Sequence, residues 1–294
     1  MQAFSVSLSS SDTPSPGAAL AAACFDAGAA LALLGQAVTT APRHQGVWRD
    51  RLVLRAAAAC LAMAGRHESD ADIRDAVLLT RPGADPGPIG HAFAEWRGLV
   101  SRTPRLTSVA DLRAILGARR SGEALDRALV LDGRPAPLAA AAAAATLHRD
   151  HPRDPALAMM VADLVLARSL GWPRLVPLLA AGLGRRPPKP DAADWPIVCT
   201  AAYGRSAGQA RLLSADLAQR ADRLLSVQAR LRAKTAAPVI SALLSEDALS
   251  ATVISDRIAP AMSDRAARRL LERLVGLDAV RELTGRATHR LYGL

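Results

Sequence analysis

The chain has 294 residues, of which half are hydrophobic and 3% aromatic, and it carries a formal net charge of +10 at pH 7. This length allows two domains, and the apolar content suffices for a substantial core. The cations are nearly all arginine, which binds phosphate and guanine through paired hydrogen bonds. Because a GC-rich genome also enriches arginine together with alanine, glycine and proline, the charge alone is weak evidence for a nucleic-acid partner.

Three cysteines, Cys24, Cys60 and Cys199, lie far apart and form no CxxC pair. An odd and sparse set of this kind argues against a disulfide framework and against a zinc site. The reducing cytoplasm is therefore the compartment that we expect.

The N-terminal region contains a polar tail and an apolar segment. Residues 1–16 are rich in Ser and Pro, which predicts disorder. Segment 17–38 is apolar except for Asp26 and could be mistaken for a membrane span. A charge near its middle penalises insertion, and no cationic stretch precedes it as in a signal peptide. We therefore expect a buried helix at 17–38 and no membrane contact.

Abundant alanine and few β-branched or aromatic residues predict an all-α fold, with a multi-helical body over 17–235. Gly, Pro and capping Ser or Asp residues separate the helical patterns. The most linker-like interior segment is 184–196. After the first helix, we expect helices at 47–64, 71–79, 91–100, 108–117, 121–131, 136–148, 155–170, 172–183 and 207–231.

The segment 236–294 is predicted to be a winged helix-turn-helix domain with a small β-hairpin wing. Three short helices are expected at 238–244, 248–258 and 263–275. Ser263 is expected to cap the third helix, and Gly276 to end it.

The predicted wing follows directly after the third helix. Two β-forming runs, LDAVREL and ATHRLYGL, flank Thr284-Gly285-Arg286, which predicts a hairpin with its turn near the glycine. The alternation of apolar and polar residues is imperfect, so the register of the two strands stays open.

The helix at 263–275 divides into two faces at roughly 100° per residue. A recognition helix needs this division, because apolar residues hold it to the domain while cations reach phosphates and base edges in the major groove. Glu272 lies on the basic face and is expected to pair with Arg268. The basic face carries Arg265, Arg268, Arg269 and Arg273, and the apolar face carries Ala267, Leu270, Leu271 and Leu274.

The sequence SDRAARRLLERLVGLDAVRELTGRATHRLYGL resembles the small C-terminal winged helix of many bacterial Fic-type proteins and related helix-turn-helix families. This resemblance implies a DNA-binding element over Ser263 to Tyr292 and no Fic activity, since the motif HPFxxGNGR is absent. The whole chain also resembles an uncharacterised proteobacterial family that ends in ELTGR…RLYGL, which implies no known activity.

These features predict a transcriptional regulator that binds double-stranded DNA as a homodimer, because one winged helix touches few bases. The alternative is a protein-interaction or toxin-antitoxin-like accessory module whose winged helix docks a partner. The expected DNA-binding residues are Ser263, Arg265, Arg268, Arg269, Arg273, Arg281, Arg286 and Arg290.

We expect no enzyme, cofactor or metal site from the remaining motifs. His148, Asp150, His151 and Asp154 lie at a helix end, where such residues satisfy terminal backbone groups. The spacing of His91 and Glu95 lacks the rest of an HExxH motif. An enzyme in the helical body is a third possibility, which a buried polar cluster with shifted pKa values would favour.

Overall fold

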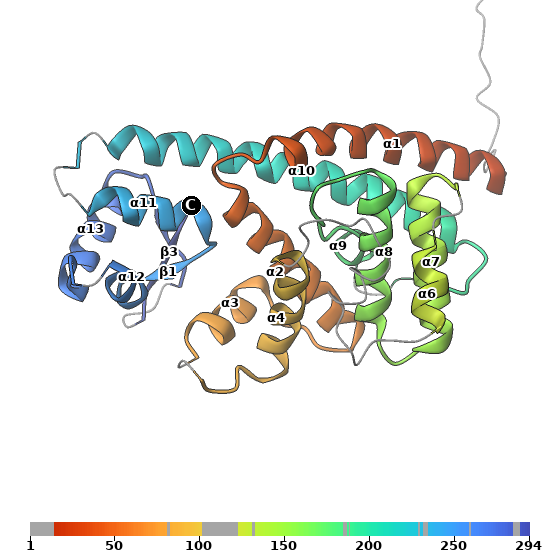
Figure 1. Ribbon diagram of the computed structural model, residues 1–294, viewed down its shortest axis with the longest axis horizontal. Coiled ribbons are helices and arrows are strands. Elements are labelled where there is room, and N and C mark those ends of the chain that lie inside the picture. Colours follow the sequence, from red (N-terminus) through yellow and green to blue (C-terminus); the bar gives the residue numbers. More distant parts are fainter. Residues whose placement is uncertain are drawn as a thin grey trace, which may run out of the picture.

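The fold is all-α, with a multi-helical body that precedes a small terminal unit (Figure 1). The computed structural model describes residues 15–80, 83–101, 123–130, 133–184, 187, 189–228, 230–231, 235–258, 260–284 and 289–294. The expected tail up to residue 14 and the expected helix at 108–117 lie outside these residues. The body contains α1 (Pro16–Thr40), α2 (Gln45–Met63), α3 (Asp70–Leu78), α4 (Gly87–Ser101), α6 (Glu123–Leu129), α7 (Ala136–Asp150), α8 (Pro155–Ser169), α9 (Leu179–Leu183) and α10 (Trp195–Gln228).

Two expectations for the second half of the body are wrong. Only the end of the segment 172–183 is helical, as α9, since Pro177 disfavours helical backbone at the residue before it. Helix α10 begins at Trp195, well before residue 207 and inside the segment expected to be a linker. Gly204 weakens the helical pattern there, but a Cβ at this position would lie 3.3 Å from the Cα of Ala27. The glycine therefore allows α1 and α10 to pack closely.

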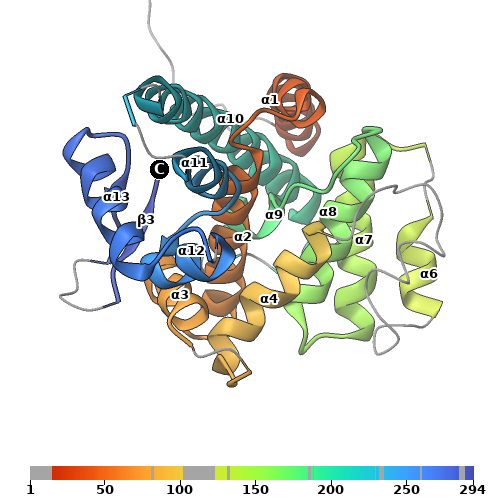
Figure 2. The ribbon, with the colours of Figure 1, turned by 60° about the vertical axis from the view of Figure 1, so that its left-hand side comes forward.

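Helix α1 lies along α10 and is not the buried helix that its composition suggested (Figures 1 and 2). Ala27, Leu31 and Leu34 face inward, whereas Phe25 is 78% exposed and Leu33 is 51% exposed. Apolar composition predicted burial on all sides, but the neighbouring helices cover only one side. By length and composition alone, α1 also meets the requirements of a membrane span.

The terminal unit has the winged-helix order of helices and strands. The three strands form an antiparallel sheet in the order β1-β3-β2. Leu249 pairs with Tyr292, and Glu282 pairs with Tyr292 from the other side, so β3 is the central strand. The sequence did not predict β1, whose two residues were assigned to a helix starting at 248. The elements are α11 (Ala236–Ser245), β1 (Leu249–Ser250), α12 (Ala251–Ile258), α13 (Asp264–Gly276), β2 (Arg281–Glu282) and β3 (Leu291–Gly293).

A buried carboxylate organises the start of α9. The side chain of Asp163 in α8 is completely buried and accepts hydrogen bonds from the backbone N–H groups of Leu178 (2.9 Å) and Leu179 (3.1 Å). Burial raises the pKa of Asp163 to about 7, although both amide donors pull the pKa downward. The carboxylate thus takes the place of a capping side chain for the first N–H groups of a short helix.

The raised pKa of Asp163 predicts a specific pH dependence of stability. The unfolded chain has an ordinary aspartate pKa near ~3.9, so the folded state binds the proton more tightly. The stabilisation is fully present below pH ~4 and is lost as the pH rises through about 7. The free energy of unfolding, measured with urea between pH 5 and 8, should fall with pH more steeply for wild type than for Asp163→Asn. The difference in slope should not exceed about 1.4 kcal/mol per pH unit.

The matched control is Asp26→Asn, which removes an exposed carboxyl from α1 and should keep the wild-type slope. Equal slopes for wild type and Asp163→Asn would contradict the raised pKa of Asp163 as the cause of the pH dependence.

Candidate nucleic-acid interface

Helix α13 is capped by a side chain at its N-terminus and by a backbone hydrogen bond at its C-terminus. The hydroxyl of Ser263 accepts a hydrogen bond from the backbone N–H of Ala266 at 3.3 Å, which confirms the predicted N-cap. At the other end, Asp278 rather than Gly276 adopts the left-handed conformation, with φ of 52°. Its N–H donates to the carbonyl of Val275, and Asp is one of the few non-glycine residues that tolerate this backbone.

The division of α13 into two faces is confirmed. Ala267, Leu271 and Leu274 are fully buried, and Leu270 is 8% exposed. These side chains pack α13 mainly against α12, which the structure places beside it. The opposite face carries charged residues that are exposed, namely Arg265, Arg268, Arg269, Glu272 and Arg273.

The four arginines of this face differ in what they contact. Arg268 forms an exposed ion pair with Asp264 at 2.9 Å. The prediction that Arg268 pairs with Glu272 is therefore wrong. Arg273 donates to the main-chain oxygen of Arg230 at 3.3 Å. Arg265 and Arg269 are exposed and form no ion pair with the residues that the structure describes.

The two strands of the expected wing pair as predicted, although they are short. Arg281 lies opposite Gly293, and the N–H of Leu283 donates to the carbonyl of Leu291 at 2.8 Å. Arg281 is exposed on β2, and Arg290 lies 3.7 Å from Glu282 across the hairpin. Arg286, which was expected at the turn, lies outside the described residues.

Helix α13 lies at one end of the molecule, and α6 and α7 lie at the other. Figure 1 shows it at the left edge beside α11 and α12, and the rotated view of Figure 2 keeps it at an edge. The arginine face points away from the apolar residues that hold the helix.

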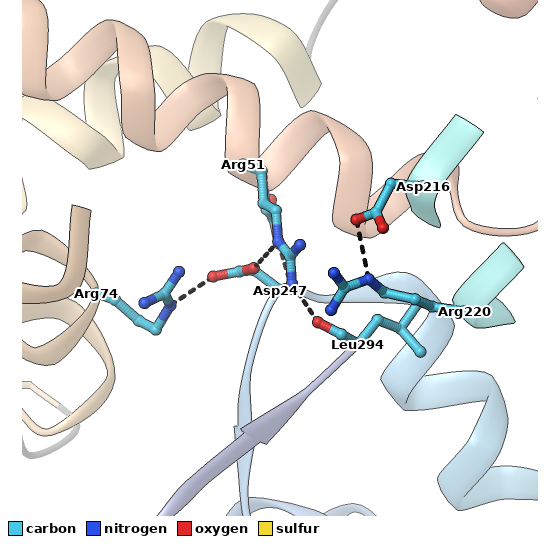
Figure 3. A network of polar contacts seen from close by, with 7 residues as sticks. Arg51, Arg74, Asp216, Arg220, Asp247 and Leu294 are labelled. Carbon is cyan, nitrogen blue, oxygen red and sulfur yellow. Dashed lines mark hydrogen bonds and ion pairs between the residues drawn. The ribbon is translucent and has the colours of Figure 1, made fainter. Parts of the chain in front are cut away.

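A network of charged side chains fixes the terminal unit to the body (Figure 3). The carboxylate of Asp247, whose side chain is 6% exposed, accepts from Arg51 of α2 at 2.8 Å and from Arg74 of α3 at 2.6 Å. Arg51 also donates to the main-chain oxygen of Leu294. These residues lie far apart in the sequence, so no local pattern could have indicated them.

A second attachment joins the end of α13 to the end of α10. Arg223 of α10 forms an ion pair with Asp278, directly after α13. Together with the contact between Arg273 and Arg230, it links the C-terminal end of α13 to the end of α10 and the residues that follow it. The N-terminal end of α13 contacts α12, where Thr252 donates to Asp264 at 3.0 Å.

The other motifs noted in the sequence have structural contacts. Asp154 caps α8 by accepting from the N–H of Leu157 at 3.0 Å, and Asp150 pairs with Arg127. His91 forms an exposed pair with Asp85. No group of three or more His, Cys, Asp or Glu residues that could hold a metal occurs in the described part of the chain.

The buried polar cluster around Asp163 lacks the access that catalysis requires. Burial raises the pKa of Cys199 and of Tyr203 well above their usual values, and both side chains are completely buried. None of these residues lines the cavity of about 940 Å³ that opens between the ends of α2 and α7. The cluster therefore fits a packed core better than an active site.

The family comparison covers both parts of the molecule. A family model described as a protein of unknown function (DUF1403) matches residues 9–294. The chain belongs to this family. A search of curated proteins finds no match. The match includes both the helical body and the terminal unit.

The network of charged side chains around Asp247 predicts that replacing Asp247 destabilises the protein much more than replacing Asp216 does. Asp247→Ala would leave Arg51 and Arg74 without their shared carboxylate in a largely dry environment, and should lower the free energy of unfolding by about 3 kcal/mol. Asp216→Ala removes the exposed partner of Arg220 and should cost at most about 1 kcal/mol. Urea unfolding of both variants measures the difference. Similar losses would mean that the network does not hold the terminal unit in place.

Proposed function

We propose that this protein binds double-stranded DNA and acts in transcriptional regulation, with α13 as the recognition helix and the β2–β3 hairpin as the wing. The observation that carries the proposal is the arginine face of α13, presented outward by a winged-helix unit at one end of the molecule. Apolar anchoring on one side and cations on the other is what insertion into the major groove requires.

The first half of α13 is the better placed for base contacts. In helix-turn-helix proteins, residues near the N-terminus of the recognition helix reach the base edges. Arg265, Arg268 and Arg269 occupy this half. The exposed pair between Arg268 and Asp264 is weak, at about 0–1 kcal/mol, so a phosphate or guanine can replace the carboxylate.

The remaining cations suit contacts with the DNA backbone. Arg281 and Arg290 belong to the hairpin, and Arg286 lies between them in sequence. The N-terminus of α13 beside Ser263 adds backbone N–H groups that favour a phosphate. Arg273 donates to the main-chain oxygen of Arg230, after the end of α10, and contributes mainly to the position of α13.

Two further features of the proposal rest on the sequence. The likeness of residues 263–294 to the winged helix of Fic-type proteins supports a DNA-binding role. One such unit contacts few bases, so we propose a homodimer that binds paired half-sites in the cytoplasm.

Docking of a protein partner is the second candidate, and the composition of the same face favours it. Asp264 and Glu272 reduce the positive charge of the arginine face, and Val275 is 37% exposed at its end. A mixed surface of this kind also suits a partner protein with complementary charges. The salt dependence of DNA binding distinguishes the two functions.

The test is fluorescence anisotropy with a labelled duplex that the full chain enriches from a random pool, titrated at several salt concentrations. Affinity should fall steeply with salt, by about 0.9 in the logarithmic slope for each phosphate contacted. Arg281→Ala should lower this slope by about one and weaken all sequences alike. Arg269→Ala should instead reduce discrimination against mismatched bases, by about 1–3 kcal/mol.

Arg153→Ala is the matched control, because Arg153 is an exposed arginine between α7 and α8 at the far end of the molecule. It should bind as wild type does. If wild type enriches no duplex at low salt, or if all three variants behave alike, the DNA proposal fails and partner docking becomes the better account.

A further inference from the structure

A cavity of about 940 Å³ opens on the body where four helix ends meet. Its walls come from the end of α2, the end of α7, the start of α8 and the residues leading into α10. The volume lies within the range that proteins use for small ligands. The residues assigned to DNA contact belong to the terminal unit, so this cavity is a separate feature.

The greater part of the wall is apolar. Met63, Met159 and Trp195 line the cavity together with several prolines. The indole N–H of Trp195 donates to the carbonyl of Ala141 at 2.9 Å, which fixes the ring in place. Methionine side chains adapt to ligands of irregular shape, so this wall suits a hydrocarbon or aromatic body.

The polar groups at the cavity share one property. His67, His148 and Lys189 line it, and each can donate hydrogen bonds or carry positive charge. Among the described residues of the lining, none is Asp or Glu. Because the polar groups in the described lining are donors or cations and not carboxylates, the lining favours an anion over a cation.

The geometry points to a small apolar carboxylic acid as the ligand. We propose that its hydrocarbon body lies against Met63, Met159 and Trp195, while its carboxylate faces Lys189 and the two histidines. A lysine ammonium bonds a carboxylate through charge-assisted hydrogen bonds, which are stronger than neutral ones. This ligand site is independent of DNA binding and can be tested without DNA.

The test compares two probes of equal chain length, decanoate and decan-1-ol, by calorimetric titration of the full chain. Decanoate should bind at least about tenfold more tightly than the alcohol, as expected when one charge-assisted hydrogen bond is added. Lys189→Gln should remove most of this advantage without changing the affinity for decan-1-ol. Arg211→Gln, which removes a cation from the exposed side of α10, should leave both affinities unchanged.

A second variant locates the binding. Ala62 lies half-buried on the cavity wall, so Ala62→Trp should fill the space and abolish binding of both probes while the circular dichroism spectrum stays that of wild type. Unchanged decanoate binding in Ala62→Trp would place the probe elsewhere, for instance on the exposed side of α1, and would overturn the proposal. Equal affinities for decanoate and decan-1-ol, or no binding of either, would overturn it as well.

Discussion

The position of the terminal unit depends on one buried carboxylate. Asp247 lies directly before the sheet, and its two oxygens are shared between guanidinium groups from α2 and α3. Removing three charges from water is costly, and only the paired geometry compensates for it. Asp50 lies beside this network, where burial raises its pKa against the lowering effect of Arg97. The position of the terminal unit, and of α13 within it, therefore depends on contacts with helices of the body that lie far away in the sequence.

Helix α10 connects the two proposed sites. At 1.5 Å per residue, its 34 residues span roughly 50 Å. Trp195 at its start lines the cavity, and Arg223 near its end holds Asp278 beside α13. Close packing with α1 along Gly204 resists bending of this helix. Helix α10 therefore spans the distance between the cavity and the residues that hold the C-terminal end of α13.

Local patterns were enough to predict α13 but not its surroundings. The faces of α13 follow from the spacing of Leu270, Leu271 and Leu274, because helical periodicity is visible in the sequence itself. Strand β1 has only two residues and exists because β3 pairs with it, so no local signal marks it. The ion pair between Arg51 and Asp247 joins segments that lie far apart in the sequence, so no local pattern predicted it either. The composition of α1 indicated an apolar helix. It could not show that α10 covers only one side of this helix and leaves the other side exposed.

The two ends of α13 are held by different contacts. Its C-terminal end is held to α10 by the pair formed by Arg223 and Asp278, and to the segment after α10 by the hydrogen bond from Arg273 to Arg230. Its first turns carry exposed arginines whose one ion pair among the described residues, between Arg268 and Asp264, is itself exposed. In helix-turn-helix proteins, the N-terminal residues of the recognition helix contact the base edges. The first turn of α13 is also held, because Thr252 of α12 donates a hydrogen bond to Asp264, so the exposed arginines lie on a helix that is anchored at both ends.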